Sequence, residues 1–337
     1  MTNPEFSVQQ DLERLRGLSW CVVGGAGFIG SHFVDAITAQ LEPSRLVVFD
    51  SLRSGSRSRI SSHLSQEAVE LVEADVQNID SLMRAFKGTD IVIHLAANPD
   101  IARAAFDPDI DFRDGTMLTR NVFEAARQLG CLDVAYASGS GIYGDLGGEI
   151  AKENHGPLIP VSTYGASKLA GEALLSAYAH MFGLRGRAYR FANVIGPRQT
   201  HGVAYDFIRQ ILAHPDHLVI QGDGQQAKPY IHVADVVRAV LGTTRAEGYP
   251  FRAFNVAVDD LLTVTEIAGL VVEALNLRLA DVDLRYTGGA RGWAGDVPVV
   301  RLNSAAIRSE GWMPTHTSAT AMRASLPPLI AEARVNG

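Results

Sequence analysis

A glycine-rich turn near the N-terminus constrains the fold of this chain more than any other feature. It reads Gly24-Gly25-Ala26-Gly27-Phe28-Ile29-Gly30, directly after the apolar run 20–23 and at the start of the amphipathic stretch 29–40. Gly24 allows a tight turn, Gly27 lets the backbone approach a phosphate, and Gly30 lets a helix pack closely on a strand. The amino end of a helix also offers N–H donors and a partial positive charge. The turn, with the backbone of Phe28 and Ile29, therefore predicts a site for the pyrophosphate of a dinucleotide.

Strand and helix patterns alternate from residue 19 onward. Apolar runs of strand length lie at residues 20–23, 46–49, 69–72, 91–95, 134–137 and 187–191. Longer amphipathic stretches include residues 29–40, 116–129 and 164–182. Such alternation predicts a parallel sheet covered on both faces, and right-handed crossovers then give a doubly wound α/β (Rossmann) fold.

The pattern becomes less regular after Phe191, where prolines interrupt it and residues 233–245 and 264–275 are the clearest helical stretches. We expect an N-terminal arm over residues 1–16, a dinucleotide-binding domain over 17–192 and a smaller α/β substrate lobe over 193–337. Residues 230–260 are expected to return to the main sheet. The length of 337 residues suits about two domains.

Charge and apolar pattern exclude several classes of function. The 30 Lys and Arg against 37 Asp and Glu give a net charge of -7, so no nucleic-acid partner is expected. No apolar stretch approaches the ~20 residues that span a bilayer, and residues 1–16 lack the apolar core of a signal peptide. Cys21 and Cys131 indicate a reducing compartment without disulfides. We expect a cytoplasmic protein with no membrane partner and no metal site.

Two acidic residues close predicted strands. Asp50 ends the second strand, where a carboxylate can bond a ribose 2′-hydroxyl and repel a 2′-phosphate, which favours NAD over NADP. A turn aspartate is the alternative, and Arg53 or Arg57 could bind a phosphate instead. Asp75 closes the third strand as a candidate partner for the adenine amino group, or as a surface turn residue. NAD is the predicted cofactor.

Tyr164 and Lys168 are the candidate catalytic pair. Their spacing on a helix places them on one face, one turn apart. There the ammonium can favour the phenolate and lower a phenol pKa that is about 10 in free tyrosine. Tyr164 would act as general base or acid on a substrate hydroxyl or carbonyl, while Lys168 bonds the nicotinamide ribose. A packing tyrosine is the alternative, which the glycine turn upstream disfavours.

Ser138 and Ser140 follow the fifth predicted strand, at the carboxyl edge where such sheets bind ligands. Either hydroxyl could orient the substrate oxygen beside Tyr164. Either could equally be a turn serine that satisfies the backbone.

Together these motifs resemble the extended short-chain dehydrogenase/reductase family, specifically its NAD-dependent sugar-nucleotide epimerases and dehydratases. Further matches are His-Leu-Ala-Ala at 94–97, Arg-Phe-Ala-Asn-Val-Ile-Gly-Pro at 190–197, Gly-Asp-Gly-Gln-Gln at 222–226 and Arg-Gly-Trp-Ala-Gly-Asp-Val at 291–297. The resemblance covers nearly the whole chain after the arm and is strongest to the UDP-glucose 4-epimerase branch. It implies that the cofactor site also includes Val76, Leu95, Ala96 and Ala97.

The resemblance also implies a substrate site in the C-terminal lobe. Asn193 would touch the sugar nucleotide near its diphosphate, and Arg291 would pair with that diphosphate. Asp296 would place the nucleotide ribose or Arg291. Lys228 stands where many relatives have an arginine on the diphosphate. Relatives often dimerise through the helices corresponding to residues 116–129 and 164–182, so a homodimer is expected.

Two departures from the family pattern bear on the reaction. Gly139 occupies the position of the family's catalytic Ser or Thr, and Ser140 with Gly141 occupies the position of the acidic pair of 4,6-dehydratases. Without an acid there, elimination lacks its general acid and base, so simple 4-epimerisation of a UDP-glucose/UDP-galactose type substrate is predicted. The alternatives are a dehydratase or 4-ketoreductase of a secondary-metabolite or glycan pathway, and a catalytically silent dinucleotide-binding protein.

Overall fold

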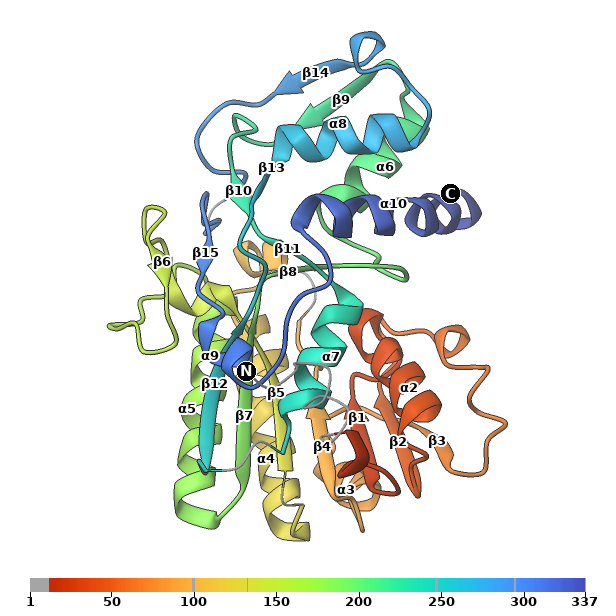
Figure 1. Ribbon diagram of the computed structural model, residues 1–337, viewed down its shortest axis with the longest axis vertical. Helices are drawn as coiled ribbons and strands as arrows, with labels where there is room; N and C mark the ends of the chain where they lie inside the picture. The colour runs from red at the N-terminus through yellow and green to blue at the C-terminus, as the bar shows by residue number, and fades with distance from the viewer. Residues whose placement is uncertain (1–11, 99–100, 132, 246–247, 294, 337) are drawn as a thin grey trace.

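A seven-stranded parallel sheet forms the larger part of the molecule in the computed structural model, which describes residues 12–98, 101–131, 133–245, 248–293 and 295–336 (Figure 1). The strand order is β12-β7-β5-β4-β1-β2-β3, and every neighbouring pair is parallel. The strands are β1 (Ser19–Val23), β2 (Arg45–Asp50), β3 (Val69–Glu73), β4 (Ile91–His94), β5 (Asp133–Gly139), β7 (Arg185–Phe191) and β12 (Phe251–Val256). The predicted doubly wound fold is confirmed.

Helices cover both faces of this sheet. They are α2 (Phe28–Gln40) and α7 (Val233–Thr243) on one face, and α3 (Ile79–Ala85), α4 (Leu118–Leu129) and α5 (Thr163–Phe182) on the other. Successive residues of β1 show why: Trp20 packs in the cluster that contains Phe33 of α2, whereas Cys21 packs with Phe123 of α4. Because side chains of a strand alternate in direction, an all-apolar strand requires a cover on each side.

The helix predicted over residues 116–129 begins differently. A π-helical turn, η3 (Phe112–Met117), precedes α4. Gly115 in this turn lies against α5, where an added Cβ would be 2.7 Å from Ser167 Oγ. Single π turns of this kind are frequent at functional sites.

A smaller lobe lies beyond the carboxyl ends of the main strands (Figure 1). Its helices are α6 (Val203–Ala213), α8 (Val264–Ala274) and α10 (Ser318–Asn336), which share a core with buried Ile208, Val271 and Leu329. Its short strands pair as β8 (Asn193–Ile195) with β11 (Tyr230–His232), β9 (His217–Ile220) with β14 (Asp283–Tyr286), and β10 (Ala227–Lys228) with β13 (Leu262–Thr263). The sequence did not indicate α10, because Pro327 and Pro328 lie inside it.

The remaining elements are short. They are β6 (Ile150–Ala151) paired with β15 (Arg301–Leu302), α9 (Ala305–Ser309), and the 3-10 turns η1 (Arg57–Arg59), η2 (Ile101–Ala105), η4 (Ser140–Tyr143) and η5 (Leu279–Asp281). Residues 1–11 of the expected arm lie outside the described residues, whereas Leu15 is buried in the core. None of the described helices combines the length and the apolar character that crossing a bilayer requires.

Candidate active site

The glycine turn joins β1 to α2 and has little room for side chains on its inner side. Gly24 has a φ of +82°, and a Cβ there would lie 2.8 Å from the backbone nitrogen of Ala96. A Cβ at Gly30 would overlap the carbonyl oxygen of Gly24. At Gly27 an added Cβ would meet only that oxygen among the described residues, at 3.2 Å. Gly27 is also the N-cap of α2, and no side chain caps the helix, so its first N–H groups can serve phosphate oxygens.

Asp50 closes β2 beside this turn. Its carboxylate accepts hydrogen bonds from the backbone nitrogens of Ala26 (2.9 Å) and Leu52 (2.8 Å), and it is 8% exposed. Each carboxylate oxygen can accept a further bond, which leaves capacity for a ribose hydroxyl. Arg53, which could have bound a 2′-phosphate, lies 2.5 Å from Asp75 and 3.7 Å from Asp114. Because two carboxylates already compensate its charge, Arg53 is a poor partner for a 2′-phosphate, and this favours NAD over NADP.

The end of β4 lies against the same turn. The backbone nitrogens of Leu95 and Ala96 donate to the carbonyl of Val23 at 2.9 and 3.1 Å. Leu95, Ala96 and Ala97 are half-buried there, and Val76 is buried beyond β3. The predicted cofactor residues therefore meet at one edge of the sheet.

The helical spacing of Tyr164 and Lys168 brings them together in the structure. The Lys168 ammonium lies 5.5 Å from the Tyr164 ring and donates to the carbonyl of Ala137 at 2.7 Å. Lys168 is 4% exposed and Tyr164 is half-buried in the first turn of α5, whose N-cap is Ser162. The serine side chain accepts from the backbone of Gly165, which fixes the start of the helix.

The sequence predicted a lowered pKa for the Tyr164 phenol, and for the protein chain without cofactor this prediction is wrong. Burial, together with the negative charge of Asp111, raises the pKa of Tyr164 to about 12. Burial lowers the pKa of Lys168 to about 8. Desolvation disfavours the charged form of each group, and across 5.5 Å the ammonium does not outweigh this effect for the phenol.

Ser138 belongs to a buried polar network rather than to an open site. Its hydroxyl donates to Glu172 at 2.5 Å, and Glu172 pairs with Arg190 at 2.7 Å. Arg190 in turn donates to the hydroxyl of Tyr143 at 2.7 Å. Ser138 is 4% exposed, so the expectation that it orients the substrate is not met by this arrangement. The network instead fixes the loop that follows β5.

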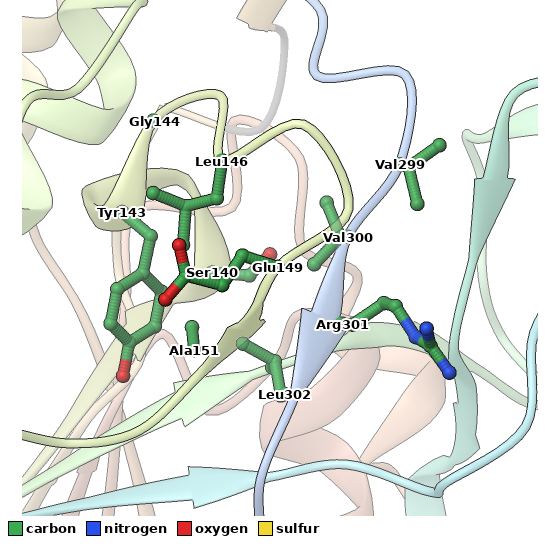
Figure 2. Close-up of a pocket in the computed structure, with 10 residues that line it drawn as sticks. All are labelled: Ser140, Tyr143, Gly144, Leu146, Glu149, Ala151, Val299, Val300, Arg301 and Leu302. Carbon is green, nitrogen blue, oxygen red and sulfur yellow. The ribbon is translucent and has the colours of Figure 1, made fainter. Parts of the chain in front are cut away.

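Gly139 leaves a side-chain position open beside this network. A Cβ added there would meet no described atom within 4 Å. Ser140, the next residue, lines a small cavity of about 10 Å³ together with Leu146, Ala151 and Leu302 (Figure 2). Its proposed role toward the substrate remains a prediction.

The predicted substrate residues gather at the base of the smaller lobe. Lys228 Nζ lies 2.6 Å from the buried carboxylate of Asp296, and Arg291 donates to the backbone carbonyl of Asp296 and lies 2.6 Å from Asp145. Asn193 pairs with Tyr230 across β8 and β11 and hydrogen-bonds to the tyrosine hydroxyl. Two cations with carboxylate partners thus lie close together, as expected for a site that exchanges those partners for phosphate oxygens.

Asp111 is the residue that sequence reasoning missed. It is 1% exposed and lies at the start of η3, where Asn98 Nδ2 (2.9 Å) and Thr163 Oγ1 (2.7 Å) donate to its two carboxylate oxygens. The sequence offered no signal for it, because Asp107, Asp109 and Asp114 flank it.

Comparison with known proteins agrees with this geometry. The model of the NAD dependent epimerase/dehydratase family matches residues 20–257. The chain belongs to this family. UDP-glucose 4-epimerase of Mycolicibacterium smegmatis is 35% identical over 227 residues, 65% of this chain and 71% of the relative.

Solved structures of this family show the same fold. A crystal structure of UDP-galactose 4-epimerase superposes with a TM-score of 0.83 at 37% identity, covering 94% of this chain and 99% of that chain. UDP-glucose 4-epimerase of Thermus thermophilus, solved in complex with NAD, has a TM-score of 0.80 at 30% identity and covers 93% of this chain and 99% of that chain. This epimerase/dehydratase family member is therefore an enzyme whose cofactor is NAD.

Proposed function

We propose that this family member is a 4-epimerase of UDP-glucose and UDP-galactose. The observation that carries the proposal is the adjacent Tyr164–Lys168 pair at the carboxyl edge of the sheet, in a site where positions 140 and 141 carry no acid. Such a pair can move one proton to and from a hydroxyl. It offers no second acid or base for an elimination.

In this proposal Tyr164 removes the proton of the C4 hydroxyl and later returns it to the same C4 oxygen, after the 4-keto sugar has turned its opposite face to the returning hydride. Bound NAD would supply the acceptor and donor of the C4 hydride, and the positive charge of its oxidised nicotinamide ring would favour the phenolate. The Lys168 ammonium stays near the phenolate and bonds the nicotinamide ribose. Because the pKa of Tyr164 is about 12 in the chain alone, we expect the phenol to ionise only with oxidised cofactor in place.

The nucleotide half of the substrate would bind at the base of the smaller lobe. We propose that Arg291 leaves Asp145 to pair with the diphosphate, while Asp296 holds Lys228 and the backbone of Gly292 in position. Asn193 would add an amide donor from β8. An exchange of Asp145 for a phosphate retains the charge balance of Arg291.

Product analysis tests this proposal. The protein should interconvert UDP-glucose and UDP-galactose without added cofactor and without net NADH, as followed by proton NMR, and Tyr164→Phe should abolish turnover. UDP-, dTDP-, GDP- and CDP-sugars tested in parallel identify the preferred nucleotide. A 4-keto-6-deoxy product or stoichiometric NADH release would favour the dehydratase or reductase instead.

We also infer a homodimer in a reducing, cytoplasmic compartment. Met117 beside α4 and Met181 and Phe182 at the end of α5 are exposed, at 49%, 71% and 48%. Large apolar side chains on neighbouring helices suit a symmetric helix-to-helix contact. Both cysteines are buried and unpaired, which suits a reducing compartment. Sedimentation of the wild type and of Met181→Glu would test the dimer.

A further inference from the structure

Asp111 is a buried carboxylate that forms no ion pair with any described Lys, Arg or His. Its two oxygens accept one hydrogen bond each, from Asn98 and Thr163, which is the pattern of an ionised carboxylate. A buried charge without an ion-pair partner is costly. Burial of this kind indicates a role that the fold alone does not require.

The two donors show which parts of the site Asp111 joins. Asn98 follows the β4 end that carries Ala96 and Ala97, and Thr163 is the first residue of α5, directly before Tyr164. Asp111 itself begins the π-helical turn η3, which packs on α5. One side chain thus links the cofactor edge, the π turn and the helix that presents the catalytic tyrosine.

The charged and titratable groups around Tyr164 are few. They are Lys168 on α5, Asp111 at η3, His94 on β4 and Tyr136 on β5. Glu172, which also acts on Tyr136, has its charge compensated by the ion pair with Arg190. Burial keeps His94 neutral by lowering its pKa to about 3. Burial likewise raises the pKa of Tyr136, so this phenol is neutral too. Asp111 is therefore the one negative charge that balances Lys168 among the described residues around the tyrosine.

We propose that Asp111 is a positioning residue of the reaction, which anchors the start of α5 through Thr163 and sets the charge of the Tyr164–Lys168 pair. With Asp111 and Lys168 both charged, the described groups around a protonated Tyr164 carry no net charge. These groups also sum to zero when a tyrosine phenolate faces the cationic nicotinamide ring of the oxidised cofactor. The same carboxylate favours the proton on both members of the pair, because a nearby negative charge raises the pKa of Tyr164 and of Lys168.

The proposal rests on the proposed catalytic role of Tyr164, and Asp111→Asn tests it. The amide keeps both hydrogen bonds, since its oxygen accepts from Asn98 and its nitrogen donates to Thr163, while the charge is lost. Both limbs of the pH profile of kcat should move to lower pH by about one unit, the lower end of the ~1–3 units by which a nearby charge shifts a pKa. Asp109→Asn, exposed on the same segment, should leave both limbs in place.

Absorbance near 295 nm separates this idea from the proposed function. The tyrosinate signal that Tyr164→Phe removes should appear at lower pH in Asp111→Asn, with about a tenfold rise in acid dissociation constant, whatever the substrate of the enzyme. An unmoved signal would refute the charge role even in an active epimerase. If Asp111→Asn does not fold, Asp111→Ser repeats the measurement with a smaller neutral side chain. Thr163→Val should lower kcat without moving the profile, and wild-type activity in that variant would refute the anchoring role.

Discussion

Gly139 is the position at which a single added hydroxyl should improve this enzyme. Its φ of -160° and ψ of 165° are extended values that any residue adopts, and a Cβ there meets no described atom within 4 Å. Gly139→Ser and Gly139→Ala should therefore fold at least as well as the wild type. A side chain also restricts the unfolded chain, which typically adds about 0.4–1 kcal/mol of stability.

The expected gain in rate follows from the hydrogen bond that the serine can donate. A hydrogen bond to a charged group contributes about 1.5–3 kcal/mol, and each ~1.4 kcal/mol is a factor of ten in rate. Because the new hydroxyl is not held by neighbours, we expect the lower end, about a tenfold higher kcat in Gly139→Ser. Gly139→Ala has the same Cβ without the donor and should match the wild type.

The assay is interconversion of UDP-galactose and UDP-glucose at saturating substrate, with thermal unfolding of the same samples. A Gly139→Ser enzyme no faster than Gly139→Ala would show that the C4 oxygen does not lie beside this position. A large loss of substrate affinity in both variants would show that the substrate itself fills the open space. Either result would refute the interpretation that position 139 lacks a hydroxyl that would contact the C4 oxygen of the substrate.

The glycine turn, the buried His94 and the two serines Ser138 and Ser140 give three further sets of predictions. Gly30→Ala should lower the free energy of unfolding by about 1–3 kcal/mol or more, because its Cβ would overlap the Gly24 carbonyl oxygen. Gly27→Ala should have the same free energy of unfolding as the wild type but retain less NAD on purification. His94 stays neutral in the fold while the unfolded chain takes up its proton below pH 6.5, so stability falls as pH drops from 6.5 toward 3. The free energy of unfolding measured in urea should fall by about 2 kcal/mol between pH 6.5 and 5 because of this group. It should fall by less in His94→Gln. Ser138→Ala should lower the melting temperature, since it removes a buried hydrogen bond. Because Ser140 lines the side cavity, Ser140→Ala should lower kcat less than about threefold, whereas a loss of tenfold or more would identify Ser140 as the third catalytic group.

Local patterns in the sequence were sufficient to predict the main sheet. Apolar runs separated by amphipathic helices determine a parallel sheet, and the six strands β1, β2, β3, β4, β5 and β7 lie within two residues of the predicted runs. The predicted cofactor residues also meet at one edge, because carboxyl ends of parallel strands must lie together. The C-terminal lobe was harder to predict, since α10 contains two prolines that its packing tolerates.

The electrostatics of the site could not be predicted from spacing. A four-residue interval places Lys168 near Tyr164 but says nothing of their burial, which raises the pKa of the phenol. Nor does any local pattern indicate that Asp111 rather than its acidic neighbours turns inward. Ser138 and Ser140 looked equivalent in the sequence, and only the tertiary contacts separate the buried partner of Glu172 from the residue that lines a side cavity.

Isotope labelling at C4 distinguishes 4-epimerisation from dehydration and from reduction. UDP-glucose that carries deuterium at C4 is incubated with the purified enzyme in ordinary water, and the products are analysed by NMR. A 4-epimerase returns the same hydride to the opposite face, so the account predicts UDP-galactose that retains the deuterium at C4. Deuterium at C6 of a 4-keto-6-deoxy sugar, or its loss into free NADH, would contradict the account.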